Sequence, residues 1–292
     1  GGYTALKKAL MMSPEEVVNV VKDAELRGRG GAGFPCGDKW TFLPETDGKT
    51  RYLCVNCDEA EPGTFKDRIL VDFDPHSVIE GMAIACYACK LEIVYFFIRG
   101  EWSHQAKIMQ HAIDEAYENG IFGSQGLMNG ASDFAVECIQ HRSAGAYICG
   151  EETALLEAVE GKRGWPRVKP PFPTDKGLFG RPTIINNVET LAAVPLIVEH
   201  GANWWKSFGC TSSIGEPASY GLKLMGVSGH VNNPDVFEVE LGIPLRTLIE
   251  QHAGGMRDGR RFKGAIAGGV STGILGTDQY DAEMDFDIGK KH

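Results

Sequence analysis

Segments that favour β-strands alternate with segments that favour α-helices from residue 51 to residue 200, and this alternation constrains the fold more than any other feature. RYLCVN and EIVYFFIRG are short apolar runs of the kind that form buried strands. DPHSVIEGMAIACYACKL and SHQAKIMQHAIDEAYENG have helical spacing. Farther along we expect a strand to Cys149, a turn at Gly150, a helix to Gly161 and a helix capped by Asn186 or Asn187. This order is typical of an α/β sheet.

From about residue 220 the pattern changes to shorter elements. LKLMGVSG and VFEVELG predict two strands, PLRTLIEQHAG predicts a helix, and GAIAGGVSTG predicts further strand structure. We therefore expect a second, smaller α+β domain. Its boundary falls between Phe208 and Ser219, in a stretch of polar residues and glycine.

Composition excludes several classes of protein. Lys and Arg number 29 against 39 Asp and Glu, a net charge of -10 that argues against a nucleic-acid partner. The most apolar run, residues 78–98, contains Glu80, Lys90 and Glu92, so it falls short of a transmembrane span of about 20 residues. Eight cysteines and no signal-peptide pattern indicate an intracellular, reduced protein. The chain begins without Met, and we expect a fragment.

The glycine-rich stretch ELRGRGGAGFPCGDKW, residues 25–40, satisfies the G-x-G-x-x-G pattern of dinucleotide-binding loops. Such a loop must follow a strand and begin a helix. Here Ser13-Pro14 predicts a helix that runs into the glycines instead, which disfavours a Rossmann fingerprint. Either the loop brings backbone N–H groups, Arg29 and Lys39 close to a flat or anionic ligand, or it is a surface turn.

The cysteines form two Cys-x-x-Cys pairs, Cys54 with Cys57 and Cys86 with Cys89. Two such pairs can bind zinc. Residues three apart on a strand point to opposite faces, however, and the second pair lies in an apolar helical segment. We weigh a zinc site against buried, inert cysteines, and the second interpretation is favoured.

Polar residues follow two of the predicted strands and lie at the start of one predicted helix: Asp58, Glu59 and Glu61; Glu151 and Glu152; and Asn186, Asn187 and Thr190. Carboxylates at the end of a strand line a crevice in α/β proteins, where they accept hydrogen bonds from ribose hydroxyls or a carboxamide. A carboxylate there also repels a 2′-phosphate, and an asparagine-rich helix start can hold a phosphate. The alternatives are a solvated loop and ordinary helix caps. Phe34, Phe42 and Phe172 flank these stretches and could stack on a base or anchor the loops.

The motifs LRGRGGAGFPxGxKW, YLxxNxDExEPGTFKDR, GAYICGEETALLxxxEGKRGxPRxKPPFP and NNVETLA occur in this order. Together they resemble the flavin-bearing NADH-dehydrogenase subunit of respiratory complex I, over almost the whole chain. Related subunits occur in NAD-linked hydrogenases and formate dehydrogenases.

The resemblance implies a flavin domain followed by a β-grasp, SLBB-like domain. The implied regions are an N-terminal helix and flavin loop (1–39), a Rossmann-like FMN/NADH-binding domain (40–207) and the β-grasp domain (208–292). The implied FMN-binding residues are Gly28, Arg29, Gly30, Lys39, Asn56, Asp58, Glu59, Gly150, Glu151, Asn186, Asn187 and Thr190. The implied NADH-binding residues are Phe34, Phe42, Glu61, Tyr147, Glu152, Lys169 and Phe172.

The implied chemistry is hydride transfer from NADH to FMN, with no catalytic side chain and no metal ligand in this chain. Single electrons would then pass to iron-sulfur clusters and quinone. The [4Fe-4S] ligands of the family would lie in a C-terminal helical domain beyond His292. Implied partners are other hydrophilic subunits of the complex, including an iron-sulfur subunit. The implied location is peripheral, on the cytoplasmic side of a bacterial membrane or the matrix side of a mitochondrial one.

Two residues depart from the family pattern: Cys36 and Asp38 stand where the family has Thr and an apolar residue. Two alternative functions remain. One is the diaphorase subunit of an NAD-linked hydrogenase or formate dehydrogenase, which the co-purifying subunits would identify. The other is a scaffold that kept the fold and lost the flavin, which an absorbance spectrum would identify.

Overall fold

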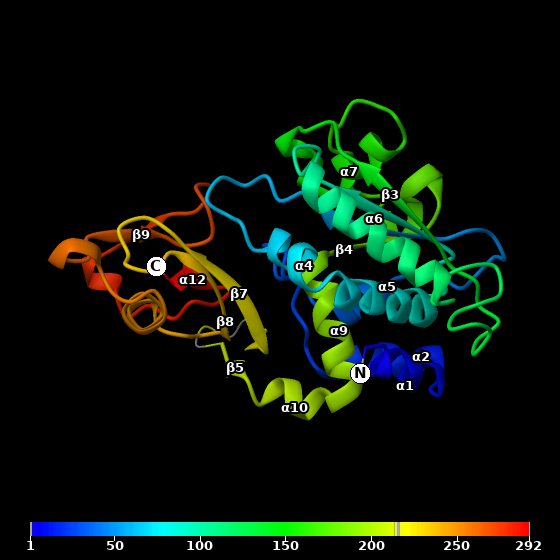
Figure 1. The fold of residues 1–292 in the computed structure, drawn as a ribbon, viewed down its shortest axis with the longest axis horizontal. Coiled ribbons are helices and arrows are strands. Elements are labelled where there is room, and N and C mark those ends of the chain that lie inside the picture. The colour runs from blue at the N-terminus through cyan, green and yellow to red at the C-terminus, as the bar shows by residue number, and fades with distance from the viewer. Residues whose placement is uncertain (1, 213, 215–216, 292) are drawn as a thin grey trace.

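Four parallel strands form the central sheet, in the order β3–β2–β1–β4. A computed structural model describes residues 2–212, 214 and 217–291 of the chain (Figure 1). The strands are β1 (Tyr52–Cys57), β2 (Ile93–Ile98), β3 (Glu137–Arg142) and β4 (Thr183–Asn187). The chain moves from β1 outward to β2 and β3, then returns to place β4 on the other side of β1. A crevice forms at such a reversal, outside the carboxyl ends of the two diverging strands.

Helices cover both faces of this sheet, as the sequence predicts for an α/β fold. They are α1 (Thr4–Leu10), α2 (Pro14–Asp23), α3 (Cys36–Thr41), α4 (Asp67–Phe73), α5 (Pro75–Cys89), α6 (Ser103–Glu118), α7 (Glu152–Val159), α8 (Pro173–Lys176), α9 (Val188–His200) and α10 (Ala202–Lys206). The predicted cap of α2 is present, because Ser13 Oγ accepts from Glu16 N and Glu16 reaches back to Ser13 N.

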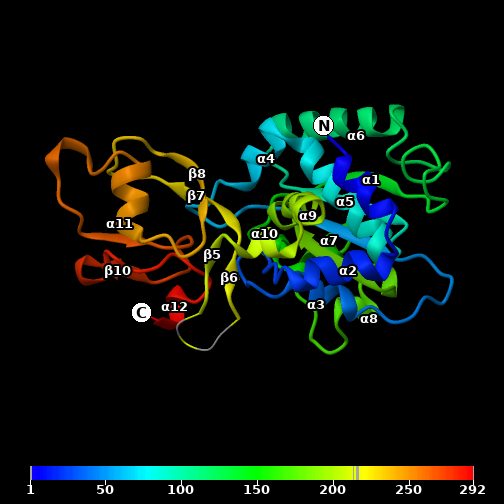
Figure 2. The same ribbon diagram turned by 90° about the horizontal axis from the view of Figure 1, so that it is seen from below.

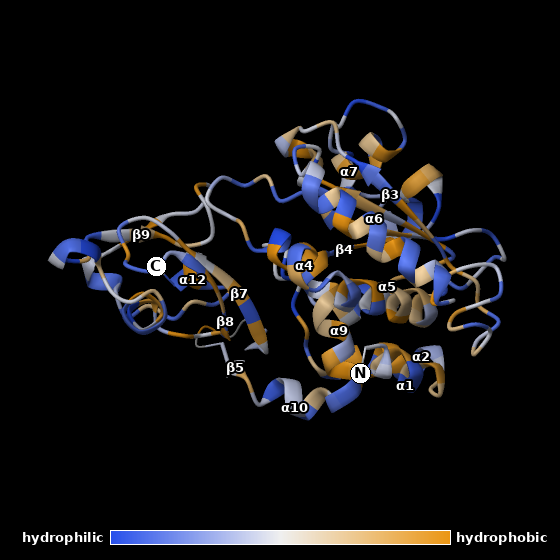
Figure 3. Ribbon diagram, viewed as in Figure 1, coloured by the Kyte–Doolittle hydropathy of each residue, from blue (hydrophilic) through white to orange (hydrophobic). Residues whose placement is uncertain are grey.

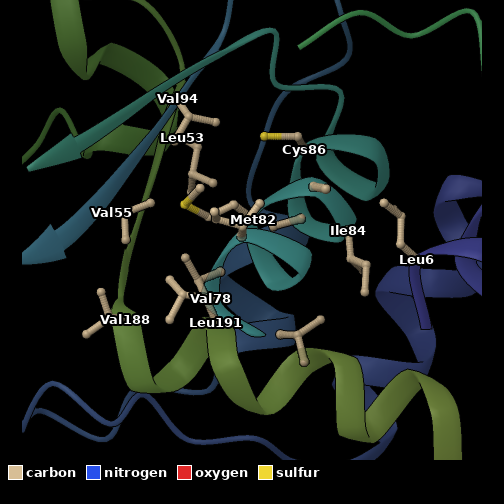
Figure 4. Packing of buried hydrophobic residues seen from close by; sticks show 14 of the residues in the cluster. Leu6, Leu53, Val55, Val78, Met82, Ile84, Cys86, Val94, Val188 and Leu191 are labelled. Carbon is tan, nitrogen blue, oxygen red and sulfur yellow. The ribbon is translucent and has the colours of Figure 1, made fainter. Parts of the chain in front are cut away.

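Alternate residues of β1 enter separate cores on the two faces of the sheet. Leu53 packs with Met82 of α5 and Leu191 of α9, and Figure 4 shows these side chains together. Cys54 enters the opposite core with Leu155 of α7. In Figure 3 hydrophobic colours extend along α5 and α9, whereas α6 carries both hydrophilic and hydrophobic residues. The mainly apolar helices α5 and α9 are therefore enclosed, and the amphipathic α6 lies at the surface.

A second, smaller lobe lies beside the first (Figure 2). Its antiparallel pairs are β5 (Gly209–Cys210) with β6 (Ser219–Tyr220), β7 (Leu222–Val227) with β8 (Asp235–Glu240), and β9 (Gly264–Ile266) with β10 (Ile274–Gly276). α11 (Leu245–Thr247) continues as a helical turn through Leu248–His252, and α12 (Ile288–Lys291) follows near the end. The predicted mixture of strands and one helix is confirmed, with Leu245, Ile249 and Leu275 in its core.

The predicted boundary segment, residues 208–219, includes residues 213, 215 and 216, which lie outside the described residues. The three predicted regions therefore stay a prediction. Within the described ranges, no helix is long and apolar enough to cross a membrane.

The predicted strand ending at Cys149 is wrong. Residues Tyr147–Gly150 form a short 3-10 turn. The strand that follows β2 in the chain is β3, which ends at Arg142, upstream of this turn. Tyr147 and Ile148 are exposed, so their apolar side chains do not mark a buried strand. The sequence of β3, ECIQHR, is polar because an edge strand faces solvent, and the apolar pattern that identifies β1 and β2 is missing there.

Candidate functional site

Three polar stretches meet at the carboxyl ends of β1 and β4. Asn56 Nδ2 donates to Gly150 O at 2.8 Å, and Asn187 Nδ2 lies 3.4 Å from Asn56 O. A Cβ added at Gly150 would lie 3.1 Å from Asp58 O, which is a closer contact than side chains normally make. The turn before α7 therefore packs directly on the end of β1, and the crevice predicted at this edge of the sheet contains residues from all three stretches.

The glycine-rich loop crosses the start of α9. Arg29 N donates to Thr190 Oγ1 at 2.8 Å, and a Cβ added at Gly30 would lie 3.2 Å from Asn187 Cβ. Gly28 N donates to Phe34 O at 2.9 Å, which closes the loop on itself. Because α2 precedes the loop and α3 follows it, the prediction that it is not a Rossmann fingerprint is confirmed. Its glycines place backbone against the ends of β4 and α9.

The side chain of Arg29 does not face the crevice. Its guanidinium is buried and donates to Tyr220 O at 2.8 Å and Leu222 O at 3.0 Å, both in the smaller lobe. Burial lowers the pKa of this guanidinium to about 10. The guanidinium therefore lies in the contact between the lobes and does not supply the positive charge that the sequence predicts for a ligand.

Asp58 carries a buried carboxylate oxygen without a partner. Oδ2 accepts from Ser143 Oγ at 3.2 Å, whereas Oδ1 has no hydrogen-bond partner among the residues that the structure describes. Burial raises the pKa of the Asp58 carboxyl to about 6. Burying an unsatisfied polar atom costs about 1–3 kcal/mol. An acceptor left free at this cost fits a ligand that supplies an N–H or O–H group.

Glu59 lies behind the end of β1 and is engaged by backbone. Its two carboxylate oxygens accept from Lys66 N at 2.9 Å and Asp67 N at 3.0 Å. Burial raises the pKa of Glu59 to about 7, and the charge of Asp67 adds to this effect. These bonds hold the segment that leads into α4. The carboxylate supports the crevice from behind, and contact with a ligand stays a prediction.

The polar side chains at the start of α9 are all bonded within the protein. Asn187 Oδ1 accepts from Glu189 N at 3.0 Å and so caps the helix, which is the capping alternative. Asn187 Nδ2 donates to Asp67 Oδ2 at 2.7 Å. Asn186 Oδ1 accepts from Trp40 Nε1 at 3.0 Å, and Thr190 is fully buried. These bonds fix the N-terminal turn of α9, whose positive end favours anions.

A group of charged side chains lies beside the Gly150 turn. Lys39 Nζ donates to Ile185 O at 3.0 Å and lies 3.9 Å from Glu152 Oε2. Lys169 bonds to Glu152 and lies 3.7 Å from Glu151 Oε1. Glu151 caps α7, because its Oε2 accepts from Thr153 N and Ala154 N at 2.9 Å. The capping alternative therefore holds for Glu151, while Glu152 lies between two ammonium groups.

The predicted aromatic side chains are exposed on loops. Phe34, Phe42, Tyr147 and Phe172 expose 46–58% of their surface. The rings of Phe34 and Phe42 are 6.0 Å apart and tilted by 55°. Tyr147 OH donates to a carboxylate oxygen of Glu61. Their exposure leaves these rings accessible to a ligand, and the stacking role stays a prediction.

The cysteines are spread through the cores. Cys54 and Cys57 lie in different apolar clusters on the two faces of the sheet, as the three-residue spacing predicts. Across the described part of the chain, no group of three or more His, Cys, Asp or Glu is placed to hold a metal ion. Cys36 is buried and accepts from Asn186 Nδ2 at 3.5 Å, while Asp38 pairs with Lys22 at 3.3 Å on the surface.

Sequence reasoning missed several polar residues around the crevice. Lys66 lies 2.7 Å from Glu189 Oε2, and Ser143 supplies the bond to Asp58. Ser271 of the smaller lobe donates its backbone N–H to Glu61 Oε1 at 2.7 Å. Lys66 stands within the motif EPGTFKDR, which could have drawn attention to it. The sequence around Ser143 and Ser271 carries no motif that indicates their contacts with Asp58 and Glu61, because only the fold brings these residues together.

The residues present fit FMN. The Asp58 oxygen without a partner suits the N–H of a flavin ring, and the glycines at positions 30 and 150 let the loop and the turn pack closely on Asn187 and Asp58. The N-terminal turn of α9 and the Lys39 ammonium supply positive charge for a phosphate.

Comparisons with known proteins agree with this geometry. The profile of the Nuo51 FMN-binding domain family matches residues 21–196, and that of the SLBB domain matches residues 224–275. An NADH-quinone oxidoreductase subunit of Rhizobium meliloti (strain 1021) is 52% identical over 288 residues, which cover 98% of this chain and 66% of the relative. The corresponding NADH-quinone oxidoreductase subunit of Mycobacterium tuberculosis (strain CDC 1551 / Oshkosh) is 47% identical over 290 residues, 98% of this chain and 63% of the relative.

A solved structure shares the fold over the full chain. A chain of an NAD+-reducing [NiFe]-hydrogenase in the H2-reduced state superposes with a TM-score of 0.84 and is 34% identical, covering 99% of this chain and 48% of that chain. The match extends through both lobes. The chain thus spans about two thirds of the relatives it resembles in sequence and about half of the hydrogenase chain.

Proposed function

This chain belongs to the Nuo51 FMN-binding domain family, and from that premise we propose that it binds FMN non-covalently and oxidises NADH as the electron-input part of an NADH-quinone oxidoreductase. The observation that carries the proposal is the buried carboxylate of Asp58, which follows β1 and whose Oδ1 has no hydrogen-bond partner among the described residues. When bound, FMN supplies the two-electron acceptor for a hydride and a donor of single electrons.

In this proposal the residues of the chain position FMN and NADH and adjust the charge around the flavin, and none of them transfers a proton. Asp58 would accept the ring N–H, and the start of α9 with Lys39 would hold the phosphate. The glycine-rich loop at Gly28 and Gly30 would contribute backbone to the same site. Asp58 and Glu59 place negative charge near the ring, which disfavours an anionic reduced form.

The dinucleotide binds on the exposed side of this crevice. Phe34, Phe42 and Phe172 offer rings for stacking, and Glu61 with Tyr147 offers acceptors for the nicotinamide half. Glu152 accepts both hydroxyls of the adenosine ribose, with Lys39 and Lys169 keeping the carboxylate in place. Its charge repels a 2′-phosphate, so the site prefers NADH to NADPH.

The names of the relatives support membership in a complex with other subunits. We propose that iron-sulfur centres outside residues 1–292 receive the electrons, that other hydrophilic subunits hold this chain, and that it is attached to the membrane only through them. The side of the membrane is cytoplasmic in bacteria and matrix in mitochondria.

Reconstitution tests the proposal. The purified chain with FMN should show a bound flavin spectrum and oxidise NADH with ferricyanide, because that acceptor takes electrons directly from the flavin. A folded chain that binds no FMN would contradict the proposal. The 34% identical hydrogenase structure favours a diaphorase as the second candidate, and the subunits that co-purify with the native protein distinguish the two.

A further inference from the structure

A turn of the smaller lobe contacts the predicted dinucleotide site in the larger one. The turn joins β9 to β10 and comprises residues 267–273, AGGVSTG; we refer to it as the β9–β10 turn. Ser271 N donates to Glu61 Oε1 at 2.7 Å, and Val270 N donates to Pro62 O at 3.2 Å. In Figure 1 the orange-red chain of this turn lies beside the light blue loop that follows β1.

Glu61 is held from both lobes. One carboxylate oxygen accepts from Ser271 N, and the other accepts from Tyr147 OH of the larger lobe. The Tyr147 hydroxyl and then Ser271 lower the pKa of Glu61, so its carboxylate stays ionised. Two donors on opposite oxygens fix the plane of the carboxylate, because each bond restricts rotation about the terminal bond of the side chain.

The approach of the turn is close enough to require glycine. Gly268 and Gly269 have φ of +107° and +102°, a conformation that other residues rarely adopt. A Cβ at Gly269 would lie 2.5 Å from Glu61 Cγ and 2.9 Å from Glu61 Oε1. The stem of Glu61 therefore packs on bare backbone, and a larger residue would displace the carboxylate.

We propose that the β9–β10 turn is a wall of the dinucleotide site, and that Ser271 and Gly269 are positioning residues that aim the Glu61 carboxylate at the nicotinamide half. This inference rests on the proposed function. Glu61 offers acceptors only, which suits ribose hydroxyls or a carboxamide NH2. Val270 and Tyr147 are both exposed and offer apolar surface for a flat ring.

Proline at position 271 tests the contact, because it removes the N–H and leaves the rest of the turn. In the FMN-loaded chain, Ser271→Pro should raise the Kd for NAD+ and the KM for NADH about tenfold, the usual effect of losing one hydrogen bond to a charged group. The rate at saturating NADH and the flavin spectrum should not change. Ser271→Ala keeps the N–H but removes the hydroxyl, which also bonds Glu61, so it should weaken NAD+ binding less than Ser271→Pro does. Gly289→Ala, a change in the same lobe that meets nothing within 4 Å, is the control expected to bind as wild type.

A second ligand distinguishes a specific effect on the Glu61 carboxylate from a general weakening of the dinucleotide site. ADP lacks the nicotinamide riboside, so its inhibition constant should be the same in Ser271→Pro and wild type. Tyr147→Phe should weaken NAD+ binding as well, and the double variant should lose less than the two single losses combined, because both bonds position one carboxylate.

Several outcomes decide the proposal. The positioning role is overturned if Ser271→Pro binds NAD+ as wild type does, or if it binds NAD+ and ADP more weakly by the same factor. In either case the proposed function still stands if the FMN-loaded wild type oxidises NADH. If the FMN-loaded wild type binds no dinucleotide, both proposals fail. If Ser271→Pro does not fold by circular dichroism, Gly269→Ala takes its place, and wild-type NAD+ binding in that variant overturns the proposal.

Discussion

Glu189 of α9 and Lys223 of β7 form an ion pair across the two lobes, in which the carboxylate is buried and 3.1 Å separates Oε2 from Nζ. Lys66 Nζ lies 2.7 Å from the same oxygen, and Leu224 N donates to the other oxygen at 2.8 Å. Burial raises the pKa of Glu189, but the ammonium groups of Lys223 and Lys66 outweigh it and bring the pKa to about 2. One carboxylate thus joins the start of α9, which borders the crevice, to the first long strand of the smaller lobe.

Glu189→Gln should destabilise the protein by about 3 kcal/mol, because Lys223 loses its counter-charge and Lys66 keeps only that of Asp67. The measurement is chemical denaturation at pH 7. Glu199→Gln, at an exposed position of the same helix, is the control and should change little. In the wild type, the ionised Glu189 stabilises the folded state fully at pH values above the ordinary Glu pKa of 4.5. This stabilisation is lost as the pH falls towards 2, the pKa of Glu189 in the folded protein. A loss below about 1 kcal/mol in Glu189→Gln would mean that solvent reaches the pair.

Asp58→Asn should stabilise the FMN-free protein at pH 8. Burial raises the pKa of Asp58 from 3.8 to about 6, so the folded state is favoured while this carboxyl is protonated. That contribution is complete below pH 3.8 and is lost as pH rises through 6. We expect the variant to melt about 3 °C above wild type at pH 8 and level with it near pH 3.5.

The exposed Asp133 supplies the control for this experiment. Asp133→Asn should leave the melting temperature unchanged at both pH values. A stabilisation of Asp58→Asn that persists unaltered at pH 3.5 would show that the gain comes from packing instead of from removing a buried charge.

Gly150→Ala should weaken FMN binding about tenfold while the chain still folds. The added methyl would lie 3.1 Å from Asp58 O, so the turn or the end of β1 must shift, and the Asp58 carboxylate shifts with it. Flavin fluorescence quenching measures the Kd. Gly289→Ala adds a methyl with nothing within 4 Å and serves as the control. Wild-type affinity in Gly150→Ala would argue that FMN does not depend on this close approach.

The local pattern was enough to predict β1, β2, α2, α5 and α6, because each is a complete apolar or amphipathic period with its own boundaries. It also placed Asn56 at the end of β1, but Gly150 was expected to follow a strand and lies in a short 3-10 turn instead, so its hydrogen bond with Asn56 was not predicted. β3 was missed because an edge strand has no need of an apolar pattern. The same reasoning explains why the exposed turn at Tyr147 was wrongly predicted to be a strand.

The direction of a side chain was harder to predict than its position. Arg29 stands beside glycines as expected, yet its guanidinium turns to the carbonyls of Tyr220 and Leu222, which are more than 190 residues away. Backbone carbonyls leave no trace in a sequence pattern, since every residue has one. Contacts between the lobes, including Ser271 with Glu61, are invisible for the same reason.

Glu152→Gln should raise the ratio of kcat/KM with NADPH to kcat/KM with NADH about tenfold. Removing the carboxylate leaves Lys39 and Lys169 with less counter-charge near the adenosine ribose, and an added 2′-phosphate then meets attraction where it met repulsion. Steady-state oxidation of both nucleotides with ferricyanide measures the ratio. Glu118→Gln makes the same change of charge at an exposed position of α6 and should leave the ratio as in wild type. If the ratio is unchanged in Glu152→Gln while NADH still binds, another residue excludes the 2′-phosphate and the role assigned to Glu152 is wrong.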